Sequence, residues 1–112
     1  MKLKPSMREK RRYLVFEVFS KKPVSGFNAL SAIQREASSF MGSSGIAKSG
    51  FKPLSRMWSS NLQRGMIQVD RKYVEQAKAS LCLTKKVGRQ NAILRSVGVS
   101  GMINKAKERY LR

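Results

Sequence analysis

The stretch Arg12–Phe19, RYLVFEVF, decides how the rest of the chain is interpreted. It is rich in β-branched and aromatic residues, which favour a β-strand. Strand alternation gives it one fully apolar face, which should point into the core and consists of Leu14, Phe16 and Val18. The other face includes an acidic residue, so we expect it to be partly open or covered by a partner. Its members are Tyr13, Val15, Glu17 and Phe19.

The segment after this strand predicts an amphipathic helix. Ser25 or Asn28 can cap its first turn, and Gly42–Gly45 provides glycines for its end. Apolar residues recur between these points at helical spacing. They are Phe27, Leu30, Ile33, Ala37 and either Phe40 or Met41.

The middle of the chain carries weaker signals. Two short strands are expected near Arg56–Ser60 and Gly65–Val69, joined by a turn. Asp70 is a suitable N-cap for a second helix. The apolar stripe of that helix consists of Tyr73, Val74, Ala77 and Leu81.

The last third predicts a basic turn over Lys85–Gln90, a strand over Ala92–Val97 and a helix opened by Ser100. The order β-α-β-β-α-β-α favours an α+β fold, a ferredoxin-like or RRM-like sandwich with an added C-terminal helix. We expect one domain over 1–112. Its residues 1–10 form an extended basic lead-in, and 100–111 form the last helix.

Charge indicates the partner. The 112 residues hold 24 Lys and Arg against 6 Asp and Glu, a net charge of +18. Both ends, 1–22 and 85–112, are more densely positive than the middle. Self-repulsion of this size favours binding to a polyanion, and nucleic acid is the expected partner.

Composition also excludes several chemistries. The chain has no His, one Cys and no Gly-rich phosphate loop, and its six carboxylates are scattered. We therefore expect no intrinsic active site, no metal and no cofactor bound by the protein. Cys82 is interpreted as a small buried hydrophobe. No apolar run is long enough for a membrane span or signal peptide, so we expect a cytoplasmic protein without a membrane partner.

Nucleic-acid contacts are expected from charge and backbone, because the strand Gly65–Val69 lacks the rings of a standard RRM sheet. Two glycines around Ser100 and the helix start after them suit a phosphate. Basic residues before the first strand, in the turn and on the last helix add cations. The predicted RNA-binding residues are Arg8, Lys10, Arg11, Arg12, Lys85, Arg89, Ser100, Gly101, Lys105 and Arg109.

Three aromatic side chains are assigned to a partner interface. Tyr13 and Phe19 lie on the outer face of the first strand, and Trp58 lies in a polar strand. Trp is enriched at protein interfaces, although Trp58 also fits a core position. Base stacking on Tyr13 and Phe19 is the less favoured alternative.

Three segments resemble one family. Leu3–Tyr13 (LKPSMREKRRY) is similar to the opening of the archaeal ribonuclease P protein component 2 family. Arg71–Val74 with Ala79–Leu81 resembles its second core helix. Gly98–Ala106 (GVSGMINKA) resembles its C-terminal signature, in which Thr is more usual than Met102. Residues 42–64 match the family poorly.

The resemblance implies a protein cofactor of a catalytic RNA. Ribonuclease P removes the 5′ leader from precursor tRNA, and its RNA performs the hydrolysis with Mg²⁺. The implied partners are ribonuclease P RNA, ribonuclease P protein component 3 and, indirectly, precursor tRNA. Self-association is also allowed. The alternatives are a small ribosomal or other structural RNA-binding protein, a DNA-compacting protein and a stand-alone nuclease.

Overall fold

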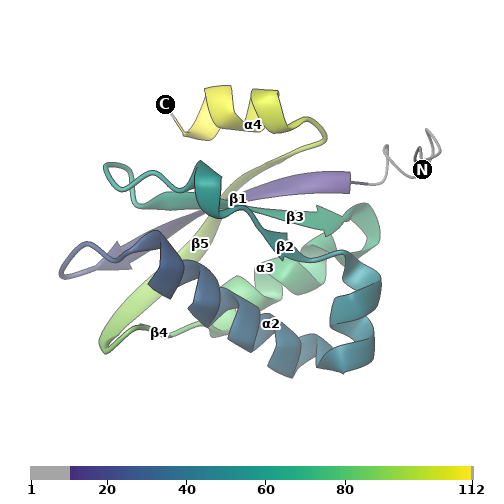
Figure 1. Cartoon of the computed structure of the whole chain (residues 1–112), viewed down its shortest axis with the longest axis horizontal. Helices are drawn as coiled ribbons and strands as arrows, with labels where there is room; N and C mark the ends of the chain where they lie inside the picture. Colours follow the sequence, from purple (N-terminus) through teal and green to yellow (C-terminus); the bar gives the residue numbers. More distant parts are fainter. Residues whose placement is uncertain (1–10, 112) are drawn as a thin grey trace.

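The computed structural model describes residues 11–111. A long strand, β1 (Arg11–Ser20), lies at the centre of a five-stranded antiparallel sheet with the order β2-β3-β1-β5-β4. Helices α2 and α3 cover one face of this sheet and α4 covers part of the other, as Figure 1 shows. The fold is therefore α+β, as the sequence predicts. The other elements are α2 (Gly26–Ser49), β2 (Lys52–Pro53), η1 (Ser55–Met57), β3 (Arg64–Asp70), η2 (Arg71–Tyr73), α3 (Val74–Leu83), β4 (Lys86–Val87), β5 (Gln90–Ser100) and α4 (Ile103–Tyr110).

The predicted inner face of β1 is confirmed. Leu14, Phe16 and Val18 are buried in the core between the sheet and the helices α2 and α3. Trp58 packs against this core with its ring centroid 6.2 Å from that of Phe16. A Cβ at Gly65 would lie 2.7 Å from the Phe16 ring, so glycine makes room for this aromatic pair. Trp58 is thus a partly buried core residue, and its contact with a partner stays a prediction.

Helix α2 differs from the prediction in where it ends and in which residues form its apolar stripe. Ser25 caps it by accepting from the Asn28 N–H at 3.1 Å. Gly42, with φ of 73°, kinks the helix, which then continues to Ser49 and ends at Gly50. A glycine inside a helix tolerates such a kink, so Gly42 interrupts the helix without ending it. Phe27 was wrongly assigned to the apolar stripe, since it is exposed. Of the two alternatives at the end of the stripe, Phe40 is exposed and Met41 is partly buried.

The expected strand over Arg56–Ser60 is wrong. Residues Ser55–Met57 form a 3₁₀ turn, and Ser59 makes only an isolated bridge to Arg64. β3 pairs with β1 on one side, and the strand on its other side is Lys52–Pro53, at the sheet edge, where the missing N–H of proline is tolerated.

The second half of the chain follows the prediction more closely. The Asp70 carboxylate accepts from the Lys72 N–H at 2.9 Å and caps the turn that leads into α3. Ala77 and Leu81 of the predicted stripe are buried. Cys82, however, is exposed, because it lies on the solvent side of α3 next to the buried Leu81. None of the helices within residues 11–111 is both long and apolar enough to cross a membrane.

Helix α4 buries a second, smaller cluster on the outer sheet face. Val15, Met66, Leu54 and Ala106 form its buried centre. Val15 was predicted on a partly open face, and here α4 supplies the cover. Opposite Val15 the β1–β5 register shifts by one residue, so that Val97 is the extra residue of a bulge.

Candidate nucleic-acid interface

The antiparallel pairing of β1 and β5 brings the two basic ends of the chain together. Tyr13 at the start of β1 pairs with Ser100 at the end of β5. A Cβ at Gly101 would lie 3.6 Å from Nη1 of Arg12, so the guanidinium of Arg12 lies beside the turn into α4. Arg8 and Lys10 of the predicted site fall outside the described residues.

The turn into α4 is held by Ser100. Its hydroxyl accepts from the Met102 N–H at 3.2 Å and donates to the Met102 carbonyl at 3.1 Å. Helix α4 therefore begins at Ile103, later than the predicted start at Ser100. The serine hydroxyl fixes the local backbone, and the exposed Gly101 follows it directly.

Helix α4 separates apolar from basic side chains, as its sequence predicts. Ile103, Ala106 and Tyr110 pack on the sheet. The basic side chains are all exposed: Lys105 and Arg109 lie away from the packed face, and Lys107 lies at its margin. We call the cationic surface at this end of the sheet the α4 edge, and it comprises Arg11, Arg12, Ser100, Gly101, Lys105 and Arg109.

Sequence reasoning missed two further cations at the same end of the sheet. Arg11 pairs with Asp70 across β1 and β3. The exposed Arg71 and Lys72 follow Asp70 directly and so begin where β1 begins. If the strand that ends at Asp70 had been paired antiparallel with the strand that starts at Arg11, Arg71 and Lys72 would have been expected beside Arg11.

The predicted residues Lys85 and Arg89 lie at the opposite end of β5. Both lie near the short β4–β5 turn. Arg89 lines a hollow with Lys21 and Lys22 at the end of β1, whereas Lys85 lines another hollow with Lys86 and with Glu36 of α2. The side-chain amide of Gln90 connects the start of β5 to the end of β1: it donates to the Lys22 carbonyl at 3.0 Å and accepts from the Lys22 N–H at 3.3 Å. We call this second cationic surface the hairpin cluster, and it comprises Lys21, Lys22, Lys85, Lys86 and Arg89. About ten steps of β5, roughly 33 Å, separate it from the α4 edge.

The three predicted interface aromatics do not come together. Tyr13 packs against the cluster under α4, and Trp58 packs against the core on the other side of the sheet. Phe19 lies on the outer face and is 44% exposed. Of the three, only Phe19 is exposed, whereas Tyr13 and Trp58 are partly buried.

Carboxylates near these surfaces serve as ion-pair partners. Glu17 lies between Arg64 and Arg95 and accepts a 3.3 Å hydrogen bond from each. Within residues 11–111 no three His, Cys, Asp or Glu side chains lie close enough together to hold a metal ion. The chemistry available at both ends is thus the binding of anions by guanidinium, ammonium and backbone N–H groups.

Fold and surface together define a small basic α+β protein with two cationic ends on one sheet. Residues 12–111 match the Rpp14/Pop5 family. The chain is 35% identical over 109 residues to ribonuclease P protein component 2 of Thermococcus gammatolerans, covering 97% of this chain and 89% of that one. Identity to the protein of the same name from Methanosarcina mazei is 32% over 111 residues, covering 99% and 92%. For the Pyrococcus furiosus protein it is 32% over 109 residues, covering 97% and 89%.

The chain therefore belongs to the Rpp14/Pop5 family. The resemblance found in its sequence is confirmed.

Proposed function

We propose that this chain is a non-catalytic protein subunit of ribonuclease P that binds and stabilises the catalytic domain of the RNA. The observation that supports this most strongly is the α4 edge, where the sheet register joins Arg12 to the turn before α4. The names of the archaeal relatives support the choice of ribonuclease P RNA among structured RNAs.

The proposed mechanism is electrostatic. Cations of the α4 edge neutralise phosphates where RNA helices converge, so that the repulsion between those helices falls. The RNA then folds its active core at a lower Mg²⁺ concentration. In this proposal the RNA removes the 5′ leader of precursor tRNA with Mg²⁺ that it binds itself, and the protein supplies no catalytic group.

The remaining parts of the proposal concern context. Ribonuclease P protein component 3 is the proposed protein partner, precursor tRNA is contacted indirectly, and the cytoplasm is the proposed location.

We also propose that the core is ferredoxin-like. The order β2-β3-β1-β5, with α2 and α3 on one face, supports this assignment, and β4 extends the edge beyond β5.

The test is the salt dependence of binding to the isolated catalytic-domain RNA of ribonuclease P. Lys105→Ala and Arg109→Ala each remove one exposed cation from α4, and alanine preserves the helix. Loss of one phosphate contact should reduce the slope of log affinity against log salt by about 0.9. The matched control is Lys48→Ala, which removes an exposed cation from the end of α2.

The expected result is a smaller slope for both α4 variants and an unchanged slope for the control. In reconstituted ribonuclease P, the same two variants should raise the Mg²⁺ concentration needed for precursor-tRNA cleavage. Equal slopes for all three variants would remove α4 from the interface. A wild-type protein that prefers ribosomal RNA to ribonuclease P RNA would contradict the proposed function itself.

A further inference from the structure

Helix α4 covers only half of the outer sheet face. The cover ends at a row of three charged side chains, in which Glu17 of β1 pairs with Arg64 of β3 and Arg95 of β5. Nη1 of Arg64 also donates to the carbonyl of Tyr110 at 2.9 Å, and this contact holds the last turn of α4 at the row. Beyond the row the outer face has no cover from the described residues.

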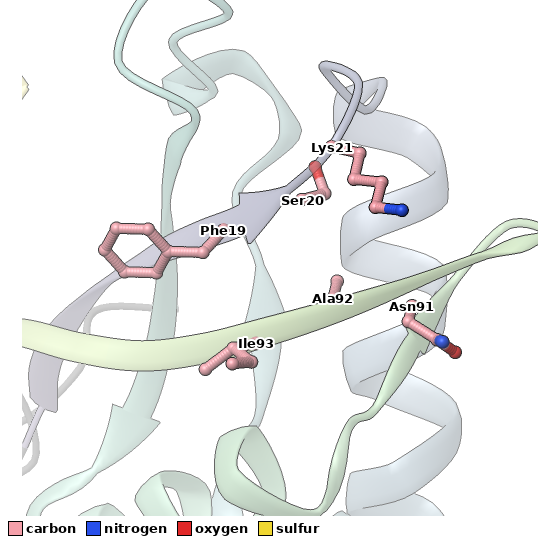
Figure 2. Close-up of a pocket in the computed structure, with 6 residues that line it drawn as sticks. All are labelled: Phe19, Ser20, Lys21, Asn91, Ala92 and Ile93. Atoms are coloured by element: carbon pink, nitrogen blue, oxygen red, sulfur yellow. The ribbon is translucent and has the colours of Figure 1, made fainter.

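The uncovered half presents two large apolar side chains. Phe19 and Ile93 are a cross-strand pair on β1 and β5 and are 44% and 69% exposed. Figure 2 shows their side chains on the same side of the two strands, with Ser20, Lys21, Asn91 and Ala92 completing a shallow hollow. Adjoining exposed apolar side chains are a feature of binding surfaces, so this area is a candidate for one.

The ring of Phe19 already has a cationic neighbour. The guanidinium carbon of Arg95 lies 4.9 Å from the centre of the ring, within cation–π range. Arg95 is oriented by its 3.3 Å hydrogen bond to the Glu17 carboxylate. We call Phe19, Ile93 and Arg95 the open shelf. The Phe19 ring and the Arg95 guanidinium are planar groups on neighbouring strands of the sheet, and both side chains are exposed.

The hairpin cluster borders the open shelf. Lys21 lines the hollow beside Phe19 and also the neighbouring hollow formed with Lys22, Arg89 and Gln90. Cations therefore lie next to the planar groups on the side away from α4. Glu17 is the acidic residue of this area, and its charge is offset by Arg64 and Arg95.

We propose that the open shelf binds one unpaired nucleotide of single-stranded RNA. Its base stacks on the Phe19 ring and the Arg95 guanidinium, and the adjoining phosphates lie on Lys21, Lys22 and Arg89. Stacking on aromatic and guanidinium planes beside a cationic groove is the general way in which proteins bind single strands. This inference rests on the proposed RNA-binding function and adds a second contact of a different kind from the α4 edge.

The composition of the surface favours RNA over a protein partner. A stable protein interface needs roughly 800 Å² on each side with several apolar anchors. The open shelf offers two large apolar side chains, and charged groups bound it on both sides. A single base covers such an area, and its phosphates complement the surrounding positive charge.

The experiment compares two phenylalanines of similar exposure. Phe19→Ala removes the stacking ring, whereas Phe40→Ala removes a 48% exposed ring from α2, on the opposite face of the sheet. Binding to a fluorescent eight-nucleotide oligouridine is measured by anisotropy for the full chain and both variants. Phe19→Ala should weaken binding about 5- to 100-fold, the effect of losing one base–aromatic stack, while Phe40→Ala leaves it unchanged. Phe19→Trp should retain binding.

A second measurement locates the base directly. In wild-type protein, ring currents from a stacked base should shift the methyl NMR signals of Ile93 on addition of oligouridine, and those of the buried Ile33 should stay in place. This measurement depends on no substitution, so it holds even where a variant folds poorly.

The outcomes separate this inference from the proposed function. Failure of the wild-type protein to bind catalytic-domain RNA contradicts the proposed function. Normal binding of that RNA, with equal oligouridine affinities for Phe19→Ala and Phe40→Ala and unshifted Ile93 methyls, overturns only the open shelf. Loss of a protein subunit from the reconstituted enzyme on Phe19→Ala, with oligouridine binding intact, would assign the shelf to a protein and also overturn the inference.

Discussion

The two halves of the outer sheet face share an alternating pattern but have opposite environments. Near the start of β1, Val15 and its neighbour Met66 on β3 are fully buried under α4, whereas Phe19 and Ile93 at the other end are largely exposed. The difference arises because α4 ends where Arg64 binds the carbonyl of Tyr110. Alternation along a strand thus identifies a face, and the length of a distant helix decides how much of that face meets solvent.

The largest expected difference between the halves is in packing. Met66→Ala should lower the free energy of unfolding by about 2–5 kcal/mol, because it empties a fully buried position under α4. Met102→Ala is the matched control, since Met102 is 55% exposed, and it should change the free energy by less than about 0.5 kcal/mol. Urea unfolding followed by circular dichroism measures both. Equal losses would show that α4 does not seal the covered half.

The close approach of α4 to the sheet gives the next largest effect. A Cβ at Gly98 would overlap the Tyr110 ring, so Gly98→Ala should cost about 1–3 kcal/mol in urea unfolding. Gly101→Ala, whose added Cβ meets nothing closer than 3.6 Å, should cost much less. In a Tyr110→Ala background the effect of Gly98→Ala should largely disappear. Its persistence there would refute the clash as the cause.

The charged row between the halves contributes a smaller amount. Glu17→Gln removes the carboxylate that Arg64 and Arg95 share, and it should cost about 1 kcal/mol at low salt and less at high salt. Glu75→Gln, which disrupts the exposed pair with Lys78, should have little effect. Urea unfolding at two salt concentrations provides the comparison. A loss that does not respond to salt would indicate packing as the source.

The smallest expected effect belongs to the open half. Ile93→Thr keeps a β-branched side chain on an exposed strand position, so the free energy of unfolding should stay within about 0.5 kcal/mol of wild type. Thermal and urea unfolding both measure this. A larger loss would show that Ile93 supports the fold, and the contrast between the two halves would then fail.

Elements with strong periodicity were predictable from the sequence. The strand around Leu14 and the helix after Asp70 depend on local patterns, and both are present in the structure, although Asp70 caps the 3₁₀ turn before the helix and not the helix itself. The segment around Trp58 was not predictable, because its ring packs against Phe16 on a strand about 40 residues earlier in the chain, and no local pattern encodes that contact. Exposure of Phe40 and Cys82 depends on which side of each helix packs against the rest of the fold, which is also non-local.

The candidate site was predictable in its charges and less so in its geometry. Clusters near Arg12 and Lys105 could be recognised from composition, and the resemblance identified the family. The sequence did not join Lys21 and Lys22 to Arg89, since that requires the register of β1 against β5. Arg95 was missed for the same reason, because its role comes from its cross-strand neighbours Glu17 and Phe19.

The small size of the apolar cluster under α4 has a thermodynamic consequence. Docking of α4 on the sheet buries this cluster and keeps the start of this cationic helix, just after Gly101, beside the guanidinium of Arg12. Mutual repulsion therefore favours local opening of α4, and amide hydrogens in this helix should exchange faster than those of the central strand β1. A polyanion that binds only the docked arrangement shifts that opening equilibrium by mass action. The free energy of docking α4 on the sheet and the affinity for RNA are then thermodynamically linked, so a change in one changes the other.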